Sequence, residues 1–108
     1  MKYGLKDKTI DSLQTVFSIY PEVEKAILYG SRAKGNFKPA SDIDITLVGE
    51  TLNLDILNQI EWKLDDLLLP YTIDLSISHS LKNVVLLEHI KKEGMVLYEK
   101  LTKQNLVG

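Results

Sequence analysis

Short apolar runs alternate with amphipathic segments along this chain, and that alternation limits its fold more than any other feature of the sequence. Apolar residues recur at helical spacing from Asp7 to Tyr20, where Pro21 ends the pattern. A second helix is expected to follow an N-cap at Asn53 and to run through Leu68. Each helix has one apolar stripe, so each should cover one face of a sheet.

Four short segments have the length and composition of strands. They are Lys25 to Tyr29, Asp42 to Val48, Tyr71 to Ile77 and Met95 to Tyr98. Between the last two, Ser80 is expected to cap a third helix, which Gly94 closes at the C′ position. Val84, Leu87 and Ile90 of this helix should face the core. Helices that alternate with short strands indicate an α/β or α+β layer around a small sheet.

Length and composition indicate one compact domain. The 108 residues, 44% hydrophobic and 26% charged, suffice for a single core over residues 1–101, followed by a frayed tail over residues 102–108. No apolar run approaches the roughly 20 residues of a membrane span, and the amino terminus lacks the pattern of a secretory signal, so a cytoplasmic protein is expected. The absence of cysteine excludes disulfides, thiolate catalysis and cysteine-bound zinc. The net charge of -2 argues against a broad nucleic-acid-binding surface.

Two aspartates at the start of the expected second strand are the strongest candidates for chemistry. Side chains alternate between the faces of a strand, so Asp42 and Asp44 point the same way, with Cα atoms roughly 6–7 Å apart. Their carboxylates repel each other unless a cation lies between them, and Mg²⁺ typically combines one or two carboxylates with substrate phosphates. Asp74 could complete the set if the third strand lies beside the second, which would allow two ions about 3.5–4 Å apart.

The segment before these aspartates suits a phosphate group. Gly30 lets the main chain approach a phosphate closely, while the N–H groups and hydroxyl at Ser31 favour an anion. The candidate nucleotide-binding residues are Gly30, Ser31, Arg32, Lys34 and Ser41. Ser41 also has the more ordinary interpretation of capping or orienting the loop. The loop lysines, Lys34 and Lys38, are in most proteins solvated charges rather than ligands.

Two other motifs fail on this segment. A Walker A loop requires Lys and then Ser or Thr after its second glycine, but Asn36 and Phe37 follow Gly35. An EF-hand beginning at Asp42 would require glycine at its sixth position and glutamate at its twelfth, where leucine and asparagine stand.

The combined pattern resembles the signature of the DNA polymerase β-type nucleotidyltransferase superfamily, and the short chain is similar to the minimal nucleotidyltransferases of that group. The residues that carry the resemblance are Gly30-Ser31, Gly35, Ser41-Asp42-Ile43-Asp44 and Asp74. The resemblance implies a small mixed sheet flanked by helices, which binds ATP or another nucleoside triphosphate through Mg²⁺. Two ions are implied, and Mn²⁺ is expected to substitute for Mg²⁺.

The resemblance also implies roles for individual residues. Asp42 and Asp44 would hold the metal ions. Asp74 would be the third ligand and would help to deprotonate the acceptor hydroxyl. Gly30 and Ser31 would contact the β- and γ-phosphates.

A partner protein is implied in the same way. Many minimal nucleotidyltransferases act as antitoxins beside a small helical HEPN-domain protein, and some transfer AMP onto a tyrosine of that toxin. A short chain without a second domain favours an acceptor supplied by another protein or by a self-assembled dimer. The rival interpretation is a non-catalytic, antitoxin-like module that neutralises a partner by contact. Three mutually repelling carboxylates argue against this interpretation, because a nucleotide site that has lost its activity has no need of them.

Overall fold

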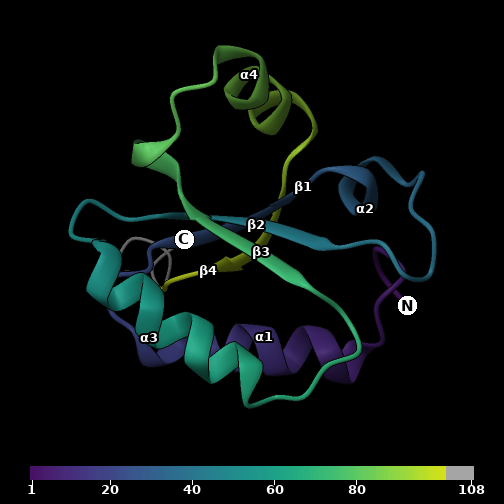
Figure 1. The fold of residues 1–108 in the computed structure, drawn as a ribbon, viewed down its shortest axis with the longest axis horizontal. Helices are drawn as coiled ribbons and strands as arrows, with labels where there is room; N and C mark the ends of the chain where they lie inside the picture. Colours follow the sequence, from purple (N-terminus) through teal and green to yellow (C-terminus); the bar gives the residue numbers. More distant parts are fainter. Residues whose placement is uncertain (102–108) are drawn as a thin grey trace.

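A four-stranded mixed sheet forms the centre of the computed structural model, which describes residues 1–101. The expected frayed tail, residues 102–108, lies outside the described residues. The strands are β1 (Lys25–Tyr29), β2 (Ile43–Val48), β3 (Ile73–Ile77) and β4 (Met95–Glu99). They lie in the order β3-β2-β1-β4 (Figure 1). β1 is antiparallel to both β2 and β4, whereas β2 and β3 are parallel. This arrangement confirms the expected α+β class with a small mixed sheet.

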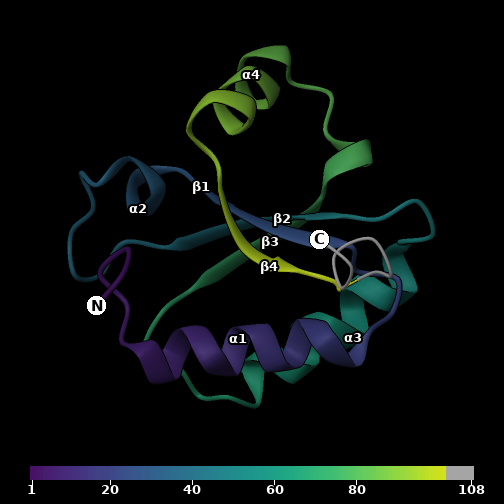
Figure 2. The ribbon, with the colours of Figure 1, turned by 180° about the vertical axis from the view of Figure 1, so that it is seen from behind.

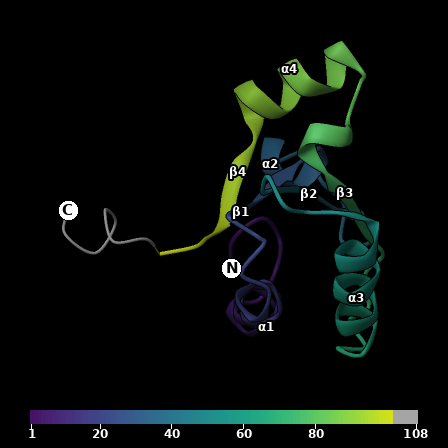
Figure 3. The same ribbon diagram turned by 90° about the vertical axis from the view of Figure 1, so that its left-hand side faces the viewer.

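Helices cover both faces of the sheet. They are α1 (Asp7–Ile19), the short α2 (Ser31–Lys34), α3 (Leu54–Asp65) and α4 (Val84–Glu93), with a 3₁₀ turn, η1 (Ser78–Ser80), before α4. Figures 1 and 2 show α1 and α3 on one side of the sheet and α4 on the other, and the edge-on view in Figure 3 separates these layers. α3 supplies the crossover that two parallel strands require. No helix within residues 1–101 is long and apolar enough to cross a membrane.

The main core lies between the sheet and the pair α1 and α3. Alternate residues of each strand point to this side, where they are buried against apolar residues of the two helices. The strand members of this core are Ala26, Leu28, Ile43, Ile45, Leu47, Leu75, Ile77 and Leu97. The same alternation directs the intervening residues of β1, β2 and β3 to the opposite side, where polar residues gather. The pleat therefore separates an apolar face that stabilises the fold from a face that carries the polar residues of these strands.

Most expected elements are present, with small shifts at their ends. α1 ends one residue earlier than expected, and β1 has the expected bounds. Asn53 caps α3 as expected, because its side-chain oxygen accepts a hydrogen bond from the Ile56 N–H at 3.0 Å. That helix ends at Asp65, three residues before Leu68.

The start of α4 differs from the expectation. Asn83, not Ser80, is the N-cap, since its side-chain oxygen accepts a hydrogen bond from the Leu86 N–H at 3.0 Å. Ser80 lies in η1 instead. The expectation that Val84 faces the core is also wrong, because its side chain is 67% exposed, whereas Ile90 is buried. Val84 and Ile90 are six residues apart, which turns a helix by about 600°, or about 240° beyond one full turn, so these two side chains lie on different faces.

Gly94 ends α4, but for a different reason from the expected left-handed C′ conformation. Its φ of -64° and ψ of 143° are extended values that other residues adopt readily. A Cβ at this position would lie 2.7 Å from Ile27 Cγ2 and would collide with the Ile90 carbonyl oxygen. The glycine therefore allows α4 to approach β1 closely.

Candidate active site

Three strands bring a tyrosine and two aspartates into one row. Tyr29 of β1 is paired with Asp44 of β2, and Asp44 is paired with Asp74 of β3. Residues paired across strands point to the same face of a sheet. The third strand therefore lies beside the second, as the site requires. Asp42 is exposed and lies just before β2, so the three aspartates come from two adjacent segments.

The Asp44 carboxylate lies in an unfavourable electrostatic environment. Burial raises the pKa of the Asp44 carboxyl above its ordinary value, and the charges of Asp74 and then Asp42 raise it further. Within residues 1–101, no salt bridge reaches any of these three carboxylates. A bound cation would relieve the repulsion among them.

These residues suit a hard divalent cation that is completed by a substrate. Among the described residues, no three acidic or imidazole side chains are gathered into a preformed metal cage. Mg²⁺ seldom uses such a cage, because it usually binds one or two carboxylates together with substrate phosphates and water. Carboxylate donors and unrelieved negative charge therefore fit a metal that arrives with a nucleotide.

Gly30 packs its main chain directly against the Asp44 carboxylate. Its φ of 77° and ψ of -155° lie in a region that is essentially restricted to glycine. A Cβ on Gly30 would also collide with Asp44 Oδ2. The glycine is therefore required twice, once by its backbone conformation and once by the carboxylate beside it. The next residue, Ser31, begins α2 and is half-buried.

Arg32 has a different environment from the one expected of a phosphate ligand. Its side chain is only 1% exposed, and its guanidinium lies between two aromatic rings, with Cζ 5.3 Å from the centre of Phe37 and 4.8 Å from that of Tyr71. Four hydrogen bonds of 2.9–3.1 Å run from the guanidinium to main-chain carbonyls of Tyr3, Pro39 and Ser41. These contacts give Arg32 a structural role within the fold, and its expected contact with phosphate stays a prediction.

Ser41 and the two loop lysines differ in their contacts. The Ser41 hydroxyl accepts a hydrogen bond from the main-chain N–H of Lys38 at 2.8 Å, which orders the loop. Lys34 and Lys38 are exposed, and neither forms a salt bridge within the described part of the chain. The structure thus supports the ordering role of Ser41 and leaves the lysine side chains open to solvent.

Sequence reasoning missed a polar cluster beside the aspartates. Burial raises the pKa of the Tyr29 phenol; a hydrogen bond with Ser76 opposes this, and the charges of Asp74 and Asp44 raise the pKa further. Ser76 also donates to the fully buried Thr46 hydroxyl at 3.0 Å. Thr46 and Ser76 each follow an aspartate by two positions, so their strand periodicity was the signal that could have identified them.

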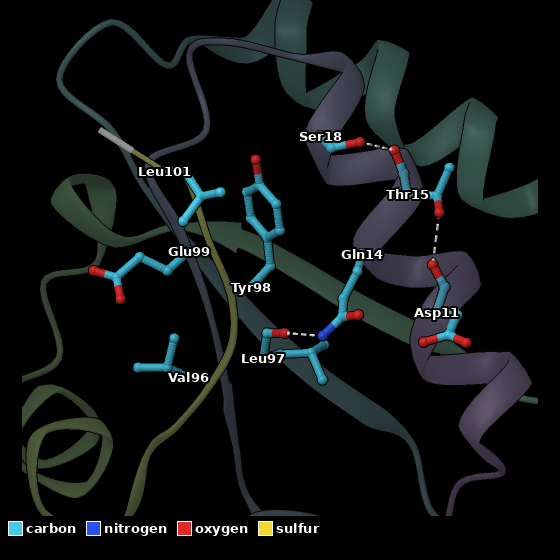
Figure 4. Close-up of a pocket in the computed structure, with 9 residues that line it drawn as sticks. All are labelled: Asp11, Gln14, Thr15, Ser18, Val96, Leu97, Tyr98, Glu99 and Leu101. Atoms are coloured by element: carbon cyan, nitrogen blue, oxygen red, sulfur yellow. Dashed lines mark hydrogen bonds between the residues drawn. The ribbon is translucent and has the colours of Figure 1, made fainter. Parts of the chain in front are cut away.

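A groove between α1 and β4 contains none of the expected site residues (Figure 4). In this groove the Gln14 amide donates a hydrogen bond to the Leu97 carbonyl at 2.8 Å. β4 and β3 are the two edges of the sheet, so the groove lies at the edge opposite Asp74.

Comparison with known proteins decides the family. Residues 11–103 match the family described as Polymerase beta, Nucleotidyltransferase. The chain belongs to this nucleotidyltransferase family. Its fold, in which the two aspartate-bearing strands lie side by side, agrees with that membership. No curated protein matches the chain.

Several solved structures share the fold. One, a crystal structure of a toxin-antitoxin with AMP-PNP, contains a chain that is 26% identical, with a TM-score of 0.65 and coverage of 94% of this chain and 77% of that chain. Another is a tri-AMPylated Shewanella oneidensis HEPN toxin in complex with MNT antitoxin, at 21% identity, a TM-score of 0.64, and coverage of 95% and 78%. A third is the toxin-antitoxin MntA-HepT, at 19% identity, a TM-score of 0.63, and coverage of 94% and 79%. At these lower identities, the last two show similarity of fold alone.

Proposed function

We propose that this protein is a Mg²⁺-dependent nucleotidyltransferase that transfers AMP from ATP to a hydroxyl of a HEPN-type partner protein. One observation carries the proposal: Asp44 and Asp74 are in register on adjacent strands, with the Gly30 main chain against the Asp44 carboxylate. The similar structures support the choice of nucleotide and partner, since one contains AMP-PNP and another contains an AMPylated HEPN toxin.

In this proposal the nucleotide is held from two sides. Asp42 and Asp44 bind the metal ions, Asp74 is the third ligand, and the main chain at Gly30 and Ser31 contacts the β- and γ-phosphates. When bound, the metal ions neutralise the charge of the triphosphate and activate the attacking oxygen. Gly30 is suited to its part because it brings the phosphate-binding turn directly against the Asp44 carboxylate.

The transfer step breaks one bond to phosphorus and forms another. The acceptor hydroxyl oxygen attacks the α-phosphorus of ATP, and the bond from that phosphorus to the bridging oxygen breaks. Pyrophosphate leaves with the electron pair, while Asp74 receives the proton of the hydroxyl and passes it to solvent. Asp74 is exposed on an edge strand, so a hydroxyl carried by another protein can reach it.

The experiment uses ATP labelled at either the α- or the γ-phosphate, with Mg²⁺ and, as the candidate partner, the product of any adjacent gene. We expect label to reach the partner from the α position only. Label from the γ position alone would identify a kinase and refute the proposal. Asp44→Asn should abolish transfer, whereas Asp11→Asn, which removes an exposed carboxylate on α1, should not.

The same assay separates catalysis from neutralisation by contact. Loss of all three site aspartates should abolish both transfer and inhibition of the partner. Full inhibition by that triple variant, without transfer, would instead indicate a non-catalytic binding module.

A further inference from the structure

Arg32 connects three parts of the chain that are distant in sequence. Its Nη1 atom donates to the Tyr3 carbonyl at 2.9 Å, and its Nε and Nη2 atoms donate to the Ser41 carbonyl at 3.1 and 2.9 Å. The third part is the approach to β3, where the Tyr71 ring lies against the guanidinium. We call this arrangement the Arg32 clamp.

The clamp is an unusual use of a buried charge. Arginine is rarely buried without a carboxylate partner, and within residues 1–101 no salt bridge reaches this side chain. Four of its five N–H groups donate to carbonyl oxygens, and the rings of Phe37 and Tyr71 supply favourable contacts with the cation. A guanidinium so engaged holds its carbonyl partners in fixed relative positions.

Both metal-binding segments of the proposed site adjoin these partners. Ser41, whose carbonyl accepts two of the bonds, immediately precedes Asp42. Tyr71 leads into β3, and the next residue, Thr72, accepts a hydrogen bond from the Ile43 N–H at 2.9 Å. The clamp therefore sets the path of the chain just before Asp42 and before the strand that carries Asp74.

The amino-terminal turn is pressed against the clamp from outside. Tyr3 has a positive φ of 58°, which is uncommon for a residue other than glycine. Gly4 has a φ of 72°, and a Cβ there would lie 2.9 Å from Arg32 Nη1 and would collide with the Phe37 ring. Leu5 is fully buried and anchors the turn. The strained backbone persists because the turn supplies the Tyr3 carbonyl to Arg32.

We propose that Arg32 is a positioning residue: by clamping the amino-terminal turn and the loop before β2, it holds the Asp42 carboxylate where it binds metal together with Asp44. This inference rests on the proposed function for the identity of the metal site. Arg32 acts through the main chain of Ser41 and not through contact with the nucleotide.

The test measures the affinity of the full-length protein for Mn²⁺ by calorimetry in the presence of a non-hydrolysable ATP analogue. In Arg32→Lys, a single ammonium cannot span the three carbonyl partners or stack between two rings. We expect a loss of Mn²⁺ affinity on the order of tenfold or more. Gly4→Ala should produce a loss in the same direction, because its Cβ displaces Arg32 and Phe37 from outside the site.

Leu13→Ala is the control. It removes buried carbons of α1, which packs on the face of the sheet opposite the Asp44 and Asp74 side chains. It should lower the melting temperature while Mn²⁺ affinity stays unchanged. A folded Arg32→Lys variant with unchanged affinity, or an equal loss of affinity in Leu13→Ala, would overturn the inference. If Arg32→Lys shows no cooperative unfolding transition, the affinity of Gly4→Ala decides the question.

The measurement also separates this inference from the proposed function. If the wild type binds Mn²⁺ and Asp42→Asn does not, but no AMP is transferred, the proposed function fails while the role of Arg32 stands. If the wild type binds no Mn²⁺ with the analogue, both are refuted.

Discussion

Replacing Gly30 with alanine tests whether this glycine exists to accommodate the Asp44 carboxylate. Gly35, at the other end of α2, provides a matched comparison, because it also has a positive φ but has no atom within 4 Å of a Cβ built on it. Both substitutions add one methyl group to a glycine next to the same short helix. Only Gly30→Ala places that methyl group against a site carboxylate.

The two substitutions should destabilise the protein to different extents. At Gly35, with a φ of 88° and ψ of 5°, alanine should cost about 1–2 kcal/mol from the left-handed backbone alone. At Gly30 the backbone region should cost about 1–3 kcal/mol. Rotation of the Asp44 side chain away from its preferred rotamer should add about 0.5–1.5 kcal/mol. The total for Gly30→Ala is therefore roughly 1.5–4.5 kcal/mol.

Urea unfolding of a double-mutant cycle isolates the contribution of the carboxylate. In an Asp44→Ala background, Gly30→Ala should be less destabilising by about 0.5–1.5 kcal/mol, because the colliding oxygen is gone. Transfer of AMP should fall on the order of 100-fold in Gly30→Ala, as expected for a misplaced catalytic group, but little in Gly35→Ala. Equal destabilisation with and without Asp44, together with retained transfer, would refute the reasoning.

Two further predictions concern stability. Burial and then the acidic neighbours raise the pKa of Asp44 in the folded protein above its ordinary value of 3.8. The protonated carboxyl therefore stabilises the fold below pH 3.8, and this stabilisation is lost as the pH rises through the pKa of the folded state. Asp44→Asn should therefore raise the free energy of unfolding of the metal-free protein at neutral pH, as measured by urea unfolding. This increase should disappear below about pH 3.8, and an increase that does not depend on pH would contradict the electrostatic cause. Asn83→Ala should lower the free energy of unfolding by about 1 kcal/mol, because α4 loses its N-cap. Ser80→Ala should lower it much less, and the reverse order would show that the cap is misassigned.

The sequence by itself determined the elements and the chemistry-bearing residues. Apolar periodicity and local caps depend on residues within a few positions of one another, which is why α1, β1 and the Asn53 cap were predictable. Asp42 and Asp44 became candidates for the same reason, because strand alternation predicts that they lie on one side. The choice between Ser80 and Asn83 failed because several polar residues before a helix can each serve as its cap.

The tertiary structure decided which of these residues meet. The sequence predicts that Arg32 contacts phosphate. In the structure it donates a hydrogen bond to the carbonyl of Tyr3, 29 positions away, and only packing of the amino-terminal turn brings that carbonyl within reach. The sequence predicts that Gly30 lets the main chain approach a phosphate, but it does not show that the pairing of β1 with β2 brings Asp44 against this glycine. Asp74 lies beside Asp44 because β3 is parallel to β2 in one particular register. Local patterns determine conformation, but long-range register and burial decide whether a polar side chain faces a ligand or stabilises the fold.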